Sequence, residues 1–268
     1  MSQGQRPNVH VRTVFLSDIH LGSRDCRADL LLEFLRAVHA DEIVLIGDIV
    51  DIWSLQRSFY WTQSHTDVLR ALLGRSRNGT RVIYVPGNHD AAFRDLCPAS
   101  FGELHIQRDY VHQTAGGLRL LVTHGDEFDV AVKCSPWLAL LGSGLYDVIL
   151  ALNRALNGLR RLRGRGYWSL AGFLKSRIGN AVQYVHRFET AAAEAARARG
   201  LDGIVCGHIH RPRLTQHAGM LYCNDGDWVD SCSALIEQPN GSLELWHWAD
   251  VRQRASTAAR QSSLASAA

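Results

Sequence analysis

Five short apolar runs, each followed at once by side chains that can bind metal ions, constrain this chain more than any other feature. The clearest is the run 82–85, which reads as a buried strand and leads through Pro86 into Gly-Asn-His-Asp at 87–90. Four more runs rich in Val, Ile and Leu end in the same manner, at Asp18-Ile19-His20, Gly47-Asp48, His124-Gly125-Asp126 and Gly207-His208-Ile209-His210. Since ligands of open α/β sheets bind at the carboxyl ends of the strands, these residues are expected to converge on one site.

Helical patterns lie between the strands and predict parallel crossovers. Residues 30–38 and 66–77 carry apolar side chains at helical spacing, and 190–199 is an alanine-rich helix that Gly200 would end. After residue 212 the pattern changes to short strands separated by turns. From the residues alone, the chain reads as a parallel α/β protein.

A segment of different character, from 130 to about 188, interrupts this pattern. It has few strand signals, a long apolar helical run at 137–156 and an arginine-rich stretch at 154–165, and we interpret it as a helical insertion over the core. An apolar helix beside arginines suits contact of the 137–168 segment with an anionic membrane, but the same apolar face could simply pack on the core. Two cations in the insertion are candidates for binding substrate phosphate, Lys175 and Arg177.

Length and composition bound the remaining possibilities. The 268 residues are enough for one large domain, expected at 1–250, with a Ser- and Ala-rich tail at 251–268 expected to be disordered. The formal net charge of +3 gives no reason to expect nucleic-acid binding, and the six cysteines form no CxxC pair and read as reduced. Neither a signal peptide nor a run of about 18 to 20 apolar residues that would cross a bilayer is apparent, so a cytosolic location is expected.

The polar residues after the five strands form a ligand set suited to transition metals. Four imidazoles, two carboxylates and one amide suit Mn, Fe, Zn or Co, and they include too many imidazoles for a dedicated Mg or Ca site. Seven ligands exceed what one ion takes, so two ions about 3.5 to 4 Å apart, bridged by one carboxylate, would use them all. The seven candidate ligands are Asp18, His20, Asp48, Asn88, His124, His208 and His210.

Each motif alone has a plainer explanation, as a turn, a helix cap or a satisfied histidine at a strand end. Together and in this order, the five motifs resemble those of the calcineurin-like metallophosphoesterase superfamily, over roughly residues 11–250. The resemblance implies a four-layer αββα sandwich, with two mixed sheets face to face, helices outside and the metals at the edge of the sheets. The second sheet is implied by the family alone.

The resemblance also implies a role for each residue. The first metal would be bound by Asp18, His20, Asp48 and His210, and the second by Asp48, Asn88, His124 and His208. A water or hydroxide between the two ions would attack phosphorus in line. His89 would donate a hydrogen bond or a proton to the leaving-group oxygen, and Asp90 would help to orient it.

Within the superfamily, residues 47–53, 124–129 and 207–212 are similar to the UDP-2,3-diacylglucosamine pyrophosphatase group of bacterial lipid A synthesis. That group releases UMP and a lipid-linked sugar phosphate, generally with manganese, and a helical insertion over the active site fits its acyl-chain-binding cap. One residue departs from the group, because His89 stands where those enzymes carry arginine. The resemblance predicts a hydrolase acting on UDP-2,3-diacylglucosamine or a similar lipid-linked nucleotide, at the inner face of the cytoplasmic membrane.

Two other classes of function remain open. The same metal chemistry could act on another phosphoester, such as a nucleotide, a phospholipid head group or a nucleic acid. A nuclease would want a basic groove with aromatic stacking residues, and the near-neutral net charge weighs against it. A non-catalytic scaffold would be expected to have lost metal ligands, whereas this chain has every one. No pattern in the sequence indicates an oligomeric state.

Overall fold

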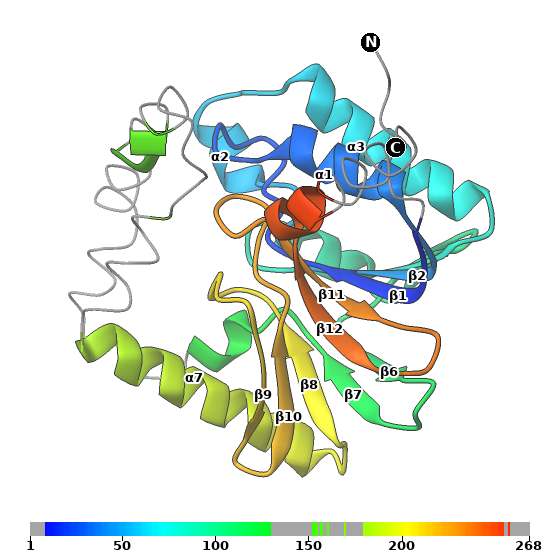
Figure 1. The fold of residues 1–268 in the computed structure, drawn as a ribbon, viewed down its shortest axis with the longest axis vertical. Helices are drawn as coiled ribbons and strands as arrows, with labels where there is room; N and C mark the ends of the chain where they lie inside the picture. The colour runs from blue at the N-terminus through cyan, green and yellow to red at the C-terminus, as the bar shows by residue number, and fades with distance from the viewer. Residues whose placement is uncertain are drawn as a thin grey trace, which may run out of the picture.

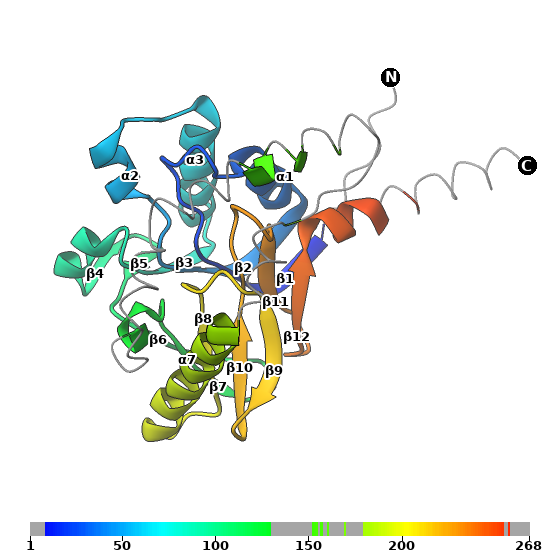
Figure 2. The ribbon, with the colours of Figure 1, turned by 90° about the vertical axis from the view of Figure 1, so that its left-hand side faces the viewer.

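The computed structural model describes residues 9–129, 152–154, 156–157, 160, 169, 179–254 and 257. In these residues two mixed β-sheets lie face to face, with helices on the outer side of each (Figure 1). Turning the molecule by 90° shows α1 (Ala28–Ala37) and α3 (Gln63–Arg77) on one side of the sheets and α7 (Gly179–Ala198) on the other (Figure 2). The four-layer αββα sandwich implied by the resemblance is therefore confirmed.

The first sheet has seven strands in the order β12-β11-β1-β2-β3-β5-β4. Its four central strands, β1, β2, β3 and β5, run parallel, as the crossover pattern predicts. On one side β11 is antiparallel to β1 and β12 is antiparallel to β11, and on the other side β4 is antiparallel to β5. The strand bounds are β1 (Val9–Leu16), β2 (Val38–Ile46), β3 (Arg81–Val85), β4 (Ala99–Phe101), β5 (Leu104–Ile106), β11 (Ser233–Glu237) and β12 (Leu243–His247).

The second sheet has five strands in the order β6-β7-β8-β10-β9. Strands β7, β8 and β10 are parallel, and β6 and β9 are antiparallel edge strands. The strand bounds are β6 (Tyr110–Gln113), β7 (Arg119–Val122), β8 (Gly203–Cys206), β9 (Arg213–His217) and β10 (Met220–Asn224). The purely parallel sheet read from the residues is thus only the centre of each real sheet.

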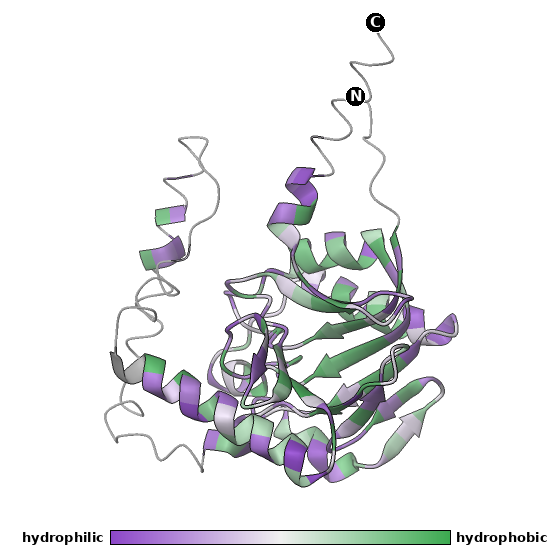
Figure 3. Ribbon diagram, turned by 60° about the horizontal axis from the view of Figure 1, so that its bottom comes forward, coloured by the Kyte–Doolittle hydropathy of each residue, from purple (hydrophilic) through white to green (hydrophobic). Residues whose placement is uncertain are grey.

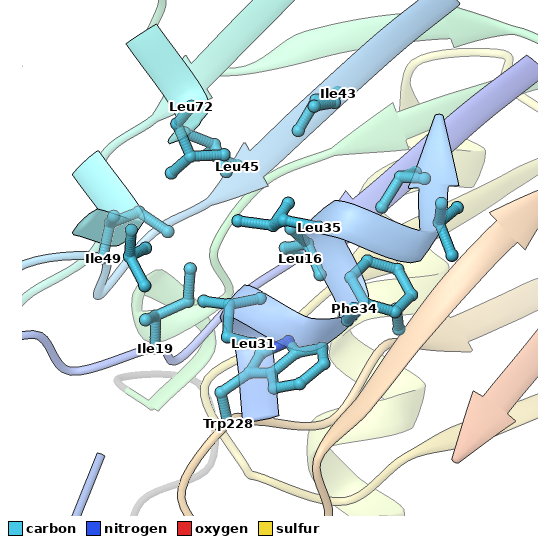
Figure 4. Close-up of a cluster of buried hydrophobic side chains, with 14 of the residues drawn as sticks. Leu16, Ile19, Leu31, Phe34, Leu35, Ile43, Leu45, Ile49, Leu72 and Trp228 are labelled. Atoms are coloured by element: carbon cyan, nitrogen blue, oxygen red, sulfur yellow. The ribbon is translucent and has the colours of Figure 1, made fainter. Parts of the chain in front are cut away.

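Three apolar layers hold the sandwich together. The first lies between the first sheet and its outer helices, where Leu31 and Phe34 of α1 pack with Trp228 (Figure 4). The second lies between the two sheets and includes Phe15 and Val205, and the third lies between the second sheet and α7. Figure 3 shows the central strands mainly hydrophobic and α7 alternating between hydrophobic and hydrophilic residues, as a helix with one buried face does.

The principal helices are α1 (Ala28–Ala37), α2 (Ile52–Arg57), α3 (Gln63–Arg77) and α7 (Gly179–Ala198). The sequence prediction of a helix from 190 was too short, because Phe188 is fully buried against the second sheet and continues the apolar face of α7 toward its start. Gly200 follows the helix at φ +64°, as expected for a residue that ends one.

The predicted insertion overlaps α7, and its residues 130–151 lie outside the described part of the chain. Residues 248–254 form a short helix after β12, so the tail expected to be disordered from 251 begins as a helix. Among the described residues, no helix combines the length and the apolar character that crossing a bilayer requires.

Candidate metal centre

Loops from both sheets meet at one edge of the sandwich. Asp18 and His20 follow β1, Asp48 follows β2 and His124 follows β7. Backbone hydrogen bonds fasten the loops together, since Asp18 donates to the Gly47 carbonyl at 3.1 Å and His20 donates to the Asp48 carbonyl at 2.9 Å. The convergence expected from the strand ends is therefore present in the fold.

The backbone at this edge is held in an uncommon conformation. Five candidate ligands have positive φ angles between 49° and 67°, a region that residues other than glycine adopt infrequently, and such backbone strain concentrates at functional sites. These five are Asp18, His20, Asp48, His208 and His210.

Three groups of side chains in this region could each hold a cation. Their ligand atoms lie within 4.8 Å of one another, and the first two groups share Asp18. The groups are Asp18 with His20 and His210, Asp18 with Asp48 and His124, and His20 with Asp51 and His89.

Contacts between single atoms link the candidate ligands further. The Nε2 atom of His210 lies 3.1 Å from Oδ1 of Asp18, and Nε2 of His124 lies 3.4 Å from Oδ2 of Asp48. Asn88 joins through its Oδ1, which is 3.2 Å from Nε2 of His124. The ring of His208 stands edge-on to that of His124, with centroids 5.2 Å apart. All seven candidate ligands therefore lie in one cluster.

The second nitrogen of three of the four candidate histidine ligands is held by an acceptor outside the cluster. The Nδ1 atom of His20 lies 3.2 Å from Oδ2 of Asp51, and Nδ1 of His124 lies 2.9 Å from the carbonyl oxygen of Ile46. The Nε2 atom of His208 lies 2.9 Å from Oδ2 of Asp129. Such outer acceptors fix the tautomer and orientation of metal-binding histidines, and they leave the other nitrogen free for an ion.

Nδ1 of the fourth histidine, His210, lies 3.6 Å from Oδ2 of the fully buried Asp227, too far for a hydrogen bond. The site residues predicted from the sequence do not include Asp51, Asp129 or Asp227. Asp51 and Asp129 could have been found from the sequence, because they lie in the same motifs as Asp48 and His124.

Unpartnered buried atoms test whether an ion fits this cluster. Both Oδ1 of Asp18 and Nε2 of His20 are buried and make no hydrogen bond in the described structure, since Nε2 of His210 lies 3.1 Å from Oδ1 of Asp18 without hydrogen-bond geometry. Burying such groups without a partner costs about 1–3 kcal/mol each, so they call for a partner that is not a protein group. A divalent cation satisfies a carboxylate oxygen and an imidazole nitrogen together, and the donor set fits a transition metal.

Electrostatics keep the carboxylates of the cluster ionised. Burial alone would raise the pKa of Asp48, but the neighbouring His124 outweighs burial and lowers the pKa to about 2. For His124, burial alone would lower the pKa, and the Asp48 carboxylate raises it to about 10. Burial opposes ionisation of Asp18 too, and His210 holds its pKa well below the ordinary value. The carboxylates are thus in the charged form that binds cations.

His89 lies beside this cluster, oriented by a different carboxylate from the expected one. Its Nδ1 lies 2.9 Å from Oδ1 of Asp51, its Nε2 lies 3.9 Å from Oδ2 of Asp48, and the indole of Trp53 covers its ring at 4.3 Å. Asp90 instead accepts hydrogen bonds from Tyr84 Oη and from backbone N–H groups, including those of Ile49 and Gly87. The expectation that Asp90 orients His89 is therefore corrected: Asp51 holds this histidine, and Asp90 holds the loop.

Comparison with known proteins identifies the arrangement. Residues 11–212, which carry all seven candidate ligands, match the family model described as calcineurin-like phosphoesterase. The chain belongs to the calcineurin-like phosphoesterase family. It is accordingly a phosphoester hydrolase, and divalent metals are the cofactors of its family.

Several relatives align with this calcineurin-like phosphoesterase over nearly the whole of their own length. A protein of Neisseria gonorrhoeae named UDP-2,3-diacylglucosamine hydrolase is 25% identical over 232 residues, covering 83% of this chain and 92% of the relative. A protein of the same name from Xanthomonas campestris is 27% identical over 248 residues, with 85% and 96% covered. Among solved structures, the phosphoesterase Yfce from E. coli is 16% identical with a TM-score of 0.42, covering 88% of this chain and 98% of that one.

Glycines of this phosphoesterase allow the metal loops to approach one another. A Cβ atom on Gly207 would lie 2.3 Å from Oδ2 of Asp18, and one on Gly87 would lie 2.3 Å from Oδ1 of Asp48. Neither glycine has a positive φ, so their backbone conformation does not demand glycine. A residue with a side chain is excluded here because the neighbouring loop lies too close.

Gly207→Ala is expected to displace Asp18 and to weaken Mn(II) binding by at least about 10-fold, the effect usual for disturbing the surroundings of a metal ligand. Titration calorimetry of metal-free protein measures this. Gly74→Ala is the matched control, because this helical glycine has nothing within 4 Å of the added Cβ and alanine favours a helix. Equal Mn(II) affinity in the two variants would show that contact with Gly207 does not position Asp18.

Two candidate substrate-binding residues, Lys175 and Arg177, lie outside the described residues. So does most of the 137–168 segment for which membrane contact is predicted.

Proposed function

We propose that this phosphoesterase hydrolyses the pyrophosphate bond of UDP-2,3-diacylglucosamine, or of a similar lipid-linked nucleotide, to UMP and a lipid sugar phosphate. The observation that carries the proposal is a similarity to relatives named for that substrate over 83–85% of this chain and 92–96% of theirs. The cluster of seven candidate ligands supports the hydrolytic chemistry. The cytosolic location and the contact with an anionic membrane stay predictions.

The proposed cofactors are two divalent ions, with manganese preferred and Fe, Zn or Co as alternatives. They would draw charge from the phosphoryl oxygens and activate a water for attack on phosphorus. The ligands for the first position are Asp18, His20, Asp48 and His210, and those for the second are Asp48, Asn88, His124 and His208. In this proposal Asp48 serves both positions, in line with its place between His20 and His124, whose Nε2 atoms lie 3.9 Å and 3.4 Å from its Oδ2.

His89 is proposed to give a proton to the leaving-group oxygen. Its Nδ1 is engaged by Asp51, so Nε2 is the nitrogen that faces the cluster and can hold the transferable proton. Trp53 covers one face of the ring and His20 meets it edge-on at 4.7 Å, so the imidazole is held in one orientation.

The test is hydrolysis by Mn(II)-loaded protein of UDP-2,3-diacylglucosamine, read as UMP release, beside the general diester bis-p-nitrophenyl phosphate. We expect UMP release from the first substrate. Cleavage of the diester without release of UMP would keep the metal chemistry and reject the named substrate. Activity on neither would reject both and return the scaffold function to consideration.

Replacing His89 with alanine is expected to lower kcat for the pyrophosphate substrate by about 10²- to 10⁴-fold, the usual contribution of a general acid. Hydrolysis of a p-nitrophenyl diester should fall far less, because p-nitrophenolate leaves without a proton. His105→Ala is the control, since this half-buried histidine contacts Ser100 on the first sheet. An equal loss on both substrates would remove His89 from the proton-transfer step.

A second substrate is favoured by the same residue. His89 stands where the UDP-2,3-diacylglucosamine pyrophosphatase group carries arginine, so the leaving-group side of this site differs from that group. The alternative function is hydrolysis of another phosphodiester, and kcat/KM measured on nucleotide, phospholipid and nucleic-acid diesters distinguishes it.

A further inference from the structure

The outer acceptor of His208 differs from those of the other candidate histidine ligands. His20 contacts Asp51, whose side chain is 6% exposed, and His124 contacts a backbone carbonyl. His208 contacts Asp129, whose side chain is 44% exposed and is therefore held by packing much less than that of Asp51. Something else must fix this carboxylate if it is to orient His208.

A hydroxyl group from α7 contacts the other oxygen of the same carboxylate. Tyr184 Oη donates to Oδ1 of Asp129 at 2.6 Å, while Nε2 of His208 lies 2.9 Å from Oδ2. A carboxylate held at both oxygens thus connects α7 to a candidate metal ligand.

The position of Tyr184 is in turn set by the packing of α7. Phe188 lies one turn after Tyr184 on the same helix face and is fully buried. Its ring meets Phe128 edge-on at 5.6 Å and lies 6.0 Å from the ring of His208. At Gly125 an added Cβ would come within 2.8 Å of Phe188, so the loop that carries Asp129 lies directly against the helix.

We propose that Tyr184 and Asp129 are positioning residues for the second metal ion, the one assigned to Asp48, Asn88, His124 and His208. Tyr184 holds Asp129, and Asp129 holds Nε2 of His208, which leaves Nδ1 as the nitrogen that would bind the ion. The packing of α7 on the second sheet therefore sets the affinity of the second position and leaves the first, at Asp18, His20 and His210, unaffected. This inference rests on the two-metal centre of the proposed function. It adds that Tyr184 and Asp129 determine how tightly the second position holds its ion.

The experiment titrates Mn(II) into metal-free protein, with calorimetry for the two dissociation constants and electron paramagnetic resonance of Mn(II) for the coordination. Tyr184→Phe removes one oxygen atom and keeps the ring on α7. We expect the dissociation constant of the second ion to rise about 10-fold or more, as loss of such outer contacts does, and that of the first to stay unchanged. Saturating Mn(II) should restore kcat, which a general loss of structure would not allow.

Tyr110→Phe is the matched control, since it removes a hydroxyl that lies 3.1 Å from Oε2 of Glu42, a residue in the middle of β2 and outside the metal cluster. It should leave both Mn(II) constants unchanged. Asp129→Asn should weaken the second ion as Tyr184→Phe does, because an amide no longer provides a charged acceptor to His208.

Three results would overturn the proposal: an unchanged second constant in Tyr184→Phe, equal weakening of both positions, or a loss of kcat that Mn(II) does not restore. Binding of a single ion by the unaltered protein would overturn it together with the two-metal centre. If the unaltered protein binds two ions and Tyr184→Phe weakens one, but no UMP is released, the substrate assignment fails and the positioning role stands.

Discussion

Asp48→Ala is expected to lower phosphoester hydrolysis by more than about 10³-fold, because even loss of a group beside a metal ligand lowers metal affinity or activity about 10- to 100-fold. Asp48 is the carboxylate nearest to several candidate ligands at once: its Oδ2 lies 3.4 Å from Nε2 of His124 and 3.9 Å from Nε2 of His20. Its other oxygen accepts the backbone N–H of His89 at 2.8 Å. Removing it takes a ligand from both proposed metal positions.

Two measurements check this prediction, UMP or p-nitrophenolate release at saturating Mn(II) and the number of Mn(II) ions bound by each protein. Asp41→Ala is the control: this aspartate lies on β2, has a 70% exposed side chain and pairs with His10, outside the metal cluster. Activity of Asp48→Ala within 10-fold of the unaltered protein would remove Asp48 from the bridging position.

The sequence predicts the convergence of the candidate ligands because each stands at a strand end. A strand such as β3 is recognisable by its apolar run, and chain direction alone places the residues after it at the carboxyl edge of a parallel sheet. No long-range information is needed to place Asn88 near Asp48. The same rule places His124 and His208 at the corresponding edge of the second sheet.

The partners of these ligands are harder to predict, because three-dimensional contact decides them. Asp90 is adjacent to His89 in sequence, yet the chain turns so that Asp90 reaches the Gly87 amide and Tyr84, and Asp51 from another loop reaches His89. Asp129 and Tyr184 are 55 residues apart and meet only because α7 packs on the second sheet. Edge strands such as β9 are also invisible to a pattern search, since their side chains are half exposed and lack a clear alternation.

A second large effect is expected far from the metal cluster, between the two sheets. His112 on β6 is buried with its Nδ1 3.0 Å from Oε1 of Glu42 and its Nε2 2.7 Å from Oε2 of Glu237, so one imidazole joins the second sheet to two carboxylates of the first. His112→Phe keeps the ring volume and removes both contacts. We expect it to lower the free energy of unfolding by about 3–5 kcal/mol, the usual result of leaving buried charges without their partner.

The pH dependence of this effect follows from two opposite pKa shifts. Burial alone would lower the pKa of His112, but its hydrogen bonds to Glu237 and Glu42 raise it above 6.5, so its contribution is complete below pH 6.5 and is lost as pH rises through the raised value. Burial alone would raise the pKa of Glu237, but hydrogen bonds from His112, the Ala115 N–H and Arg12 together outweigh it and lower the pKa to about 2. This contribution is complete above pH 4.5 and is lost as pH falls toward 2.

The destabilisation by His112→Phe should therefore be largest between about pH 4.5 and 6.5 and should shrink at alkaline pH, as the imidazolium of the unaltered protein loses its proton. Urea unfolding of both proteins at pH 5.5 and pH 9 measures the difference. His105→Phe, on β5 beside the edge strand β4, is the control and should change stability by no more than about 0.5 kcal/mol. A destabilisation that grows from pH 5.5 to pH 9 would mean that His112 joins the sheets as a neutral imidazole, which can donate a hydrogen bond to only one of the two carboxylates.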